Sequence, residues 1–221
     1  MDCCESSVYD EEFDAREAAH KLREYRRKGP NPWTARLINE LSAGGVDGLT
    51  VLEIGAGIGA VHQTLLASGA ASATDVDASG PYLAVAREEA ERRGMTGRVT
   101  FLKGDAVRLR DQLPEADLVA LDRVVCCYGD MPGLVGLAAA RARRRLGLVL
   151  PRDGRWIRAA VALANAWGAL TRNPFRVHVH RTDAVLAVAA AAGLRVTSTH
   201  RGMFWQTLVL ERGRMEPAAT A

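Results

Sequence analysis

The chain has 221 residues, of which 48% are hydrophobic and 25% are charged, a balance typical of a globular protein with a sizeable core. The formal net charge of +3 is too small to indicate a nucleic-acid partner, and no apolar run reaches the length of a membrane span. The first residues lack the basic start and apolar core of a signal peptide. We therefore expect a cytoplasmic protein with no nucleic-acid and no membrane partner. The sequence does not indicate its oligomeric state.

The N-terminal segment is polar but carries apolar side chains at roughly helical spacing, which predicts one amphipathic helix ending before Gly29-Pro30. Its last part, residues 21–28, has five basic residues against one acid. This pattern indicates a solvated helix face, or a lid that places Tyr25 and an arginine over a site. The predicted parts of the chain are a helical cap (1–30), a main domain (31–212) and a flexible tail (213–221).

Strand and helix patterns alternate from residue 49 onward, which is typical of a parallel sheet with helices on both faces. The turn at Arg201-Gly202 is too short for a crossover helix, so the last two strands should pair antiparallel. The expected fold is α/β: a seven-stranded, mostly parallel, doubly wound sheet with an antiparallel last strand and an N-terminal helical cap. The predicted strands are 50–54, 72–76, 99–102, 118–121, 148–150, 194–199 and 205–210. The predicted helices of the main domain are 31–41, 60–68, 81–93, 134–146, 156–170 and 182–192.

Two helix ends carry further expectations. The helix over 134–146 should finish in the basic run Arg141–Arg145, which suits the negative end of a helix. The helix over 182–192 should be capped by Thr182 or Asp183.

A Gly-x-Gly-x-Gly turn, formed by Gly55, Gly57 and Gly59, joins the first strand to the next helix. Glycine permits positive φ and close approach of a ligand, and the free N–H groups of a helix start favour an electron-rich guest. The turn also satisfies the dinucleotide fingerprint. Glu53, two residues before the turn, argues against a dinucleotide as the ligand. A carboxylate at the end of a buried strand needs a polar partner, such as an amino group of the ligand.

Acids follow four of the predicted strands, and the carboxyl ends of parallel strands meet at one edge of a sheet. Asp77 lies 22 residues after Gly55, where a carboxylate can accept from both hydroxyls of a ribose. Asp75 is the competitor because it points the same way off the strand. The acids at the four strand ends are Glu53, Asp75 or Asp77, Asp105 and Asp122.

These motifs, in this order, resemble the class I S-adenosylmethionine (SAM) methyltransferases over roughly residues 30–212. The resemblance implies SAM as cofactor, with Glu53, the three glycines, Asp77 and Asp122 around it. It also implies that Asp105 accepts from the adenine amine while the backbone N–H of Ala106 meets a ring nitrogen. The arrangement loosely resembles small-molecule O-methyltransferases of the magnesium-protoporphyrin type. Two alternatives remain: an NAD(P)-binding oxidoreductase, and a SAM-binding protein without catalysis.

The methyl acceptor should lie beside the loop after the fourth strand, residues 122–128. We expect a small molecule with an oxygen acceptor, because the small net charge and short insertions argue against a larger partner. Candidate catalytic residues are Asp122, Tyr128, His178 and His180, with His62 as a further candidate base near the cofactor. His178 and His180 alternate and so share one face of an extended segment, either a pocket wall or a solvated loop. Candidate acceptor-binding residues are Tyr25, Arg123, Cys126, Cys127 and Tyr128.

The four cysteines form two adjacent pairs, Cys3-Cys4 and Cys126-Cys127, which match neither a zinc pattern nor a disulfide framework. We expect reduced thiols and no metal site. Packing or pocket lining is the preferred role of the second pair. A thiol- or metalloid-directed methyltransferase that uses Cys126 and Cys127 is the remaining alternative, because thiolates are soft ligands.

Overall fold

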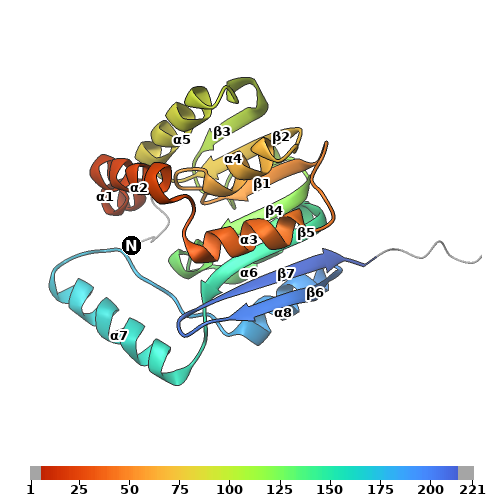
Figure 1. Ribbon diagram of the computed structural model, residues 1–221. Coiled ribbons are helices and arrows are strands. Elements are labelled where there is room, and N and C mark those ends of the chain that lie inside the picture. The colour runs from red at the N-terminus through yellow and green to blue at the C-terminus, as the bar shows by residue number, and fades with distance from the viewer. Residues whose placement is uncertain (1–5, 214–221) are drawn as a thin grey trace, which may run out of the picture.

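The computed structural model describes residues 6–213, and these form one sheet covered by helices on both faces (Figure 1). The sheet order is β3-β2-β1-β4-β5-β7-β6. β7 lies between β5 and β6 and is antiparallel to both, while the strands from β3 to β5 pair in parallel. The predicted seven-stranded α/β fold is thus confirmed. The strands are β1 Thr50–Ile54, β2 Ser72–Asp77, β3 Val99–Lys103, β4 Ala116–Asp122, β5 Ala142–Pro151, β6 Leu194–Arg201 and β7 Trp205–Arg212.

Two hydrophobic cores lie on opposite faces of this sheet. Helices α3, α4 and α5 pack on one face through side chains such as Leu37 and Leu65, and α6 and α8 pack on the other through Leu134 and Val185. The apolar strands are therefore buried on both sides, as expected for a doubly wound sheet. The helices are α1 Ser6–Glu12, α2 Ala15–Lys28, α3 Pro32–Ser42, α4 Ala60–Ala67, α5 Gly80–Arg92, α6 Met131–Arg141, α7 Arg155–Leu170 and α8 Thr182–Ala191.

The basic run 141–145 corrects one prediction, because α6 ends at Arg141 and β5 already begins at Ala142. The extended conformation lets three arginines of β5 each meet an acid that lies in a neighbouring strand or directly before it. Arg143 pairs with Glu115 (Nε to Oε2, 3.1 Å), Arg144 pairs with Asp117 (Nε to Oδ1, 3.1 Å), and Arg145 pairs with Glu211 (Nε to Oε1, 2.8 Å). These partners are distant in sequence, so the helical pattern was misleading here.

Two local predictions at helix starts were also wrong. The segment expected to form one N-terminal helix is two helices, because the Asp14 side chain accepts from the N–H groups of Arg16 and Glu17 and starts a new helix. At α8 the capping position is Arg181, and it makes no side-chain capping bond. The N–H of Thr182 is instead satisfied by Oδ2 of Asp153, 3.0 Å away.

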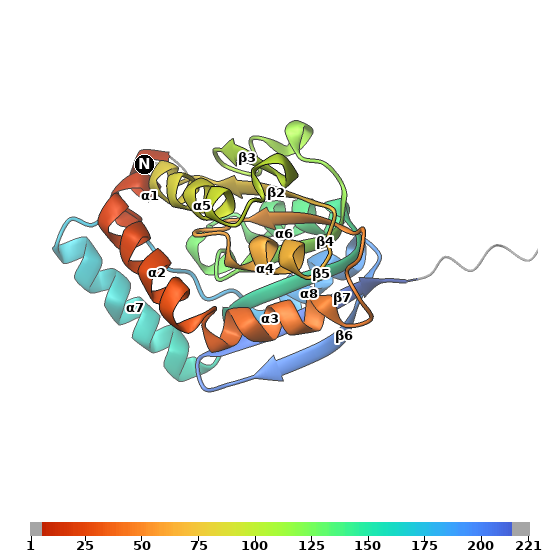
Figure 2. The same ribbon diagram turned by 45° about the horizontal axis from the view of Figure 1, so that its top comes forward.

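The two N-terminal helices lie beside α5, close to the carboxyl ends of the strands (Figure 2). α2 buries Ala18 and Leu22, and Arg26 of this helix donates from Nε to Oε2 of the buried Glu89 at 2.8 Å. In α1, the Asp10 carboxylate accepts from the N–H of Gly80 at 2.7 Å and from Nζ of Lys103 at 2.9 Å. These contacts attach the N-terminal segment to the edge of the sheet where a ligand would bind.

Candidate active site

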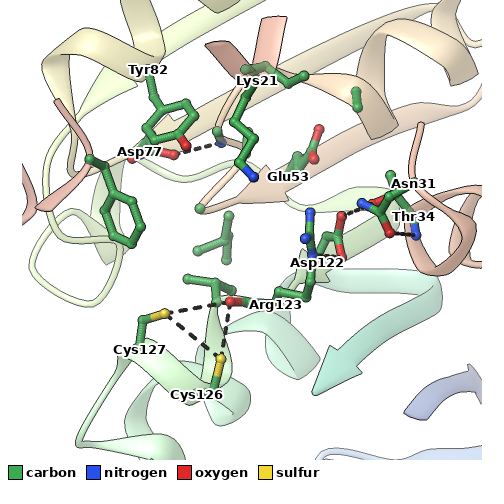
Figure 3. A pocket seen from close by; sticks show the side chains of 18 of the residues that line it. Lys21, Asn31, Thr34, Glu53, Asp77, Tyr82, Asp122, Arg123, Cys126 and Cys127 are labelled. Atoms are coloured by element: carbon green, nitrogen blue, oxygen red, sulfur yellow. Dashed lines mark hydrogen bonds and ion pairs between the residues drawn. The ribbon is translucent and has the colours of Figure 1, made fainter. Parts of the chain in front are cut away.

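A cavity of about 1050 Å³ opens at the carboxyl ends of the parallel strands. One part is polar and contains the glycine turn and the strand-end acids; the other part is apolar. Side chains from α2, the β4–α6 loop and α3 converge on the polar part (Figure 3). The position agrees with the general rule that open parallel sheets bind ligands beyond their strand ends.

The glycine turn has the backbone that its sequence predicts, with φ of +66° at Gly55, +57° at Gly57 and +77° at Gly59. A Cβ at Gly55 would overlap the side chain of Val124. At Gly57, a Cβ would meet only the ring of Tyr82, at 3.6 Å, and would otherwise project toward the cavity. Gly57 is therefore the place where backbone and ligand can approach each other most closely.

Glu53 lines the cavity although only 1% of its surface is exposed. Its Oε2 atom accepts from the backbone N–H of His62 at 2.9 Å and lies 2.7 Å from Nδ1 of the same residue. His62 is buried behind Glu53 and does not line the cavity. It therefore holds the carboxylate in place. The prediction that His62 acts as a base is not supported, because the ring is not placed to accept a proton from a bound molecule.

Asp77 and Asp75 have different surroundings. Asp77 lines the cavity and accepts from the N–H of Gly57 at 2.7 Å and of Ser79 at 2.8 Å (Figure 3). Burial raises the pKa of Asp77 to about 6, although these two backbone hydrogen bonds oppose the shift. Asp75 is fully buried beside Glu53 in the sheet, and burial together with the nearby Glu53 and Asp77 carboxylates raises its pKa well above the usual range. Asp77 is thus the one of the two that a ligand can reach.

Tyr128 is bound to Asp105, which changes its predicted role. Its hydroxyl donates to the Asp105 carboxylate at 2.9 Å from Oδ1 and 2.8 Å from Oδ2. Asp105 also accepts from the N–H of Val107 at 2.8 Å, and both Asp105 and Ala106 line the cavity. Because the hydroxyl is a donor to a carboxylate here, Tyr128 positions Asp105 and is not arranged as a base for an acceptor.

His178 and His180 share one face, as predicted, with stacked rings whose centroids are 5.7 Å apart. That face turns away from the cavity, which is lined by Val177, the residue before His178. Nε2 of His180 lies 3.1 Å from the carbonyl oxygen of Val125 and 3.0 Å from that of Tyr128. The histidine pair thus fastens its segment to the β4–α6 loop, and the prediction of two catalytic histidines is not supported.

Asp122 and Arg123 lie at the end of β4, facing the cavity (Figure 3). Asp122 accepts from the Thr34 hydroxyl and from Nε of Arg123 at 3.2 Å, and Asn31 donates from Nδ2 to Oγ1 of Thr34 at 2.6 Å. Arg123 has φ of +59°, a rare conformation for a side-chain-bearing residue, next to the functional loop. The sequence analysis missed Asn31 and Thr34, whose only local signal is a helix start.

The cap contributes Lys21 to the cavity, whereas the sequence suggested an arginine. Nζ of Lys21 points into the polar part, and its nearest described acid is Glu17 at 3.5 Å (Figure 3). Arg26 is occupied with Glu88 and Glu89. Tyr25 does line the cavity, but its hydroxyl lies 3.3 Å from Oγ1 of Thr64.

The Cys126 and Cys127 sulfurs are 3.8 Å apart, and both residues line the cavity. Sγ of Cys126 donates to the carbonyl of Arg123 at 3.3 Å. The contact between the thiols lowers the pKa of Cys126 and raises that of Cys127. Among residues 6–213 no three His, Cys, Asp or Glu side chains are grouped so as to hold a metal ion. Cys3 and Cys4 lie outside the described residues.

The apolar part of the cavity was not foreseen from the sequence. It is built from segments far apart in the chain: the cap, α6, α7 and the loops after α7 and β6. Edge-to-face ring contacts connect Phe13 with Tyr82 and Phe175, with centroids 5.7 and 5.5 Å apart. The apolar lining consists of Tyr9, Phe13, Leu134, Ala160, Val161, Ala164, Phe175, Val177, Phe204 and Trp205.

The chain was compared with protein families, curated proteins and solved structures. Residues 51–146 match the model of a family described as a methyltransferase domain. A comparison with curated proteins gives no match. Among solved structures, magnesium protoporphyrin IX methyltransferase from Synechocystis PCC 6803 with bound SAM has a TM-score of 0.68 at 18% identity, over 95% of this chain and 97% of that one. An O-methyltransferase family protein from Burkholderia thailandensis has 0.67 at 19% identity, over 93% and 63%. The cyclase SpnF has 0.61 at 15% identity, over 80% of each chain.

The structural neighbours establish the fold, and the presence of a cyclase among them illustrates that fold alone does not define a reaction. The family match spans the glycine turn and the strand ends that carry Glu53, Asp77, Asp105 and Asp122, so it agrees with methyl transfer as the reaction class. The match favours a methyltransferase over the oxidoreductase alternative. Residues 51–146 thus match a methyltransferase domain, and the fold around them is similar to that of a methyltransferase structure with bound SAM.

Proposed function

We propose that this methyltransferase transfers the methyl group of SAM to an oxygen atom of a small, largely apolar acceptor that carries an acidic hydroxyl or a carboxyl group. The observation that carries the proposal is the composition of the cavity. Its polar part matches the donors of a nucleoside and an amino acid, and its apolar part is lined by ten apolar or aromatic side chains with Arg123 at the boundary.

The polar part supports the following arrangement of the cofactor. Asp77 accepts from the ribose hydroxyls, and Asp105, held by Tyr128, accepts from the adenine amine. Glu53, held by His62, is suited to the amino group, and Lys21 to the carboxylate of the methionine part. The open side of Gly57 leaves room for the cofactor against the backbone. When bound, SAM supplies an electrophilic methyl group on a sulfonium.

The acceptor side supports catalysis by positioning. Methyl transfer is an in-line displacement, so alignment of the acceptor oxygen with the methyl group and exclusion of water are the main tasks of the protein. No histidine of the described chain lines the cavity. Arg123 is the cavity-lining cation on the β4 side, and its charge favours the deprotonated form of a phenol or carboxylic acid. Asp122 holds the Arg123 guanidinium through the 3.2 Å hydrogen bond to Nε.

A methyl-release screen over phenols, carboxylic acids, thiols and metalloids tests the proposal. We expect turnover with apolar phenols or carboxylic acids. Arg123→Gln should raise the KM of the acceptor and leave that of SAM nearly unchanged, and Lys21→Gln should do the reverse. Lys28→Gln is the control for Lys21→Gln, because Lys28 lies in the same helix α2 and also contributes a positive charge to the cavity lining. Turnover confined to thiols or metalloids would replace the oxygen acceptor by the cysteine-directed alternative.

A further inference from the structure

Helix α7 presents an apolar stripe to solvent. Ile157 is its one buried residue, and the helix lies at the outer edge of the molecule in both views (Figures 1 and 2). Four large side chains are exposed along it: Trp156 by 53%, Leu163 by 74%, Trp167 by 67% and Leu170 by 75%. At 3.6 residues per turn these positions fall within about 60° of one another around the helix axis. They therefore form one continuous stripe, which we call the α7 stripe.

The stripe continues toward the β6–β7 turn. The ring of Trp156 contacts that of Phe204, with centroids 6.3 Å apart, and Met203 in the same turn is 79% exposed. Exposed apolar side chains are common singly, but a row of two tryptophans and two leucines is not, and such rows mark interaction surfaces.

The charge carried by the α7 segment itself is of one sign. From residue 154 to residue 181 the sequence has five arginines and no aspartate or glutamate. Arg181 pairs with Asp183 just beyond this segment. Arg155, Arg158 and Arg172 are exposed and have no ion pair with any described residue. An exposed helix with tryptophan and leucine on one side and arginine near both ends has the composition of a helix that lies in a membrane interface.

We propose that the α7 stripe lies on an anionic lipid surface, with the tryptophans and leucines at the boundary of headgroups and acyl chains and the three arginines against the headgroups. Charge complementarity favours this occupant over a second copy of the chain, because a two-fold contact brings the same surface together and would place arginine near arginine. The contact is peripheral, since no helix in the described part of the chain is long and apolar enough to cross a bilayer. The proposal differs from the sequence-based expectation of a protein without a membrane partner.

The adjacent side of the same helix, about a quarter turn around the axis from the stripe, lines the cavity through Ala160, Val161 and Ala164. A helix held on a lipid surface would keep the apolar part of the cavity next to the bilayer. The lipid contact itself does not depend on methyl transfer, so it can be tested without acceptor or SAM.

The test is flotation of the full-length protein with vesicles of phosphatidylcholine alone or mixed with phosphatidylglycerol. We expect binding to the anionic vesicles, a blue shift of tryptophan fluorescence on binding, and weakening by salt. The variant Leu163→Gln/Trp167→Gln/Leu170→Gln should lose binding, whereas Val196→Gln, which removes an exposed apolar side chain from β6, should not. The variant Arg155→Gln/Arg158→Gln/Arg172→Gln should weaken binding to anionic vesicles by roughly a hundredfold, and Arg195→Gln should serve as its control.

Far-UV circular dichroism and urea midpoints establish that each variant is folded, and the positions are exposed, so both should match the parent chain. Failure of the folded parent chain to float with anionic vesicles would overturn the proposal. So would equal binding to both vesicle types, because the arginines would then have no part in it. A dimer in analytical ultracentrifugation that the stripe variant loses, without vesicle binding, would assign the stripe to self-association instead.

Discussion

Nδ1 of His62 lies 2.7 Å from Oε2 of Glu53, and both side chains are buried. The same oxygen accepts from the backbone N–H of His62, so one residue holds this carboxylate in two ways. We expect His62→Phe to keep the packing against Phe101, remove one donor to Glu53, and lower the free energy of unfolding by about 1–3 kcal/mol. The affinity for SAM should fall as well, because Glu53 loses its fixed orientation. Urea unfolding and calorimetry measure the two effects.

His20→Phe, at an exposed position of α2, is the matched control and should change neither quantity. If His62→Phe also left both unchanged, the contact between His62 and Glu53 would be incidental.

Gly57 and Gly94 form a second matched pair, because both have positive φ, +57° and +69°. A Cβ at Gly94 meets nothing within 4 Å, and one at Gly57 would extend toward the cavity. Gly57→Ala and Gly94→Ala should therefore cost similar stability, roughly 1–2 kcal/mol each. Only Gly57→Ala should weaken binding of S-adenosylhomocysteine in calorimetry. Equal affinity in the two variants would mean that the cofactor does not pass Gly57.

The sheet could be predicted from the sequence because its central parallel strands are buried on both faces and appear as short apolar runs between turn residues. The glycine turn and its flanking acid could also be recognised from the sequence, because local geometry restricts which residue types can stand there. The β5 extension was missed because its arginines depend on Glu115, Asp117 and Glu211, which only the folded chain brings near.

The predictions of side-chain roles failed where the partner of a side chain is distant in the sequence. Alternation correctly placed His178 and His180 on one face, but it cannot say which face meets the cavity. Tyr128 looked available until the fold placed it against Asp105. The apolar chamber has no local signature at all, because α1, α7 and the loop after β6 each contribute only a few side chains to it.

The neighbouring cysteines provide a third prediction. Cys126→Ser/Cys127→Ser should reduce stability by up to about 2 kcal/mol and leave turnover nearly unchanged, because a serine hydroxyl can also donate to the carbonyl of Arg123. Thermal unfolding and a methyl-release assay measure the two quantities. Loss of turnover with unchanged cofactor affinity would favour an acceptor that reacts with thiols or thiolates.

The cap provides a fourth. Asp10→Ala removes the hydrogen bonds to Gly80 and Lys103 that hold α1 over the site. Phe13 and its contacts with Tyr82 and Phe175 should then open more often. We expect kcat/KM to fall by roughly tenfold while the sheet stays folded. Glu11→Ala, at the exposed neighbouring position, is the control. Unchanged kinetics in Asp10→Ala would reduce α1 to a surface element.

The last prediction is the pH dependence caused by Asp77, whose pKa of about 6 lies above the roughly 3.9 of an unfolded aspartate. Between these values the folded state binds more protons than the unfolded state, so the free energy of unfolding of the cofactor-free protein should fall as the pH rises through this window. Asp75, whose pKa is also raised, adds a slope of the same sign. The contribution of Asp77 is therefore the difference between the parent chain and Asp77→Asn in urea unfolding.

Cofactor binding should show the opposite slope. Ribose hydroxyls donate to the ionised carboxylate, so binding favours loss of the proton and the affinity for S-adenosylhomocysteine should decrease as the pH falls below about 6. Calorimetry at about pH 5 and pH 7 measures the change, and proton release on binding is a second readout from buffers of different ionisation enthalpy. Asp77→Asn should bind more weakly and lose most of this pH dependence, because its amide does not titrate. An affinity in the parent chain that stays constant over this range would remove Asp77 from the ribose site.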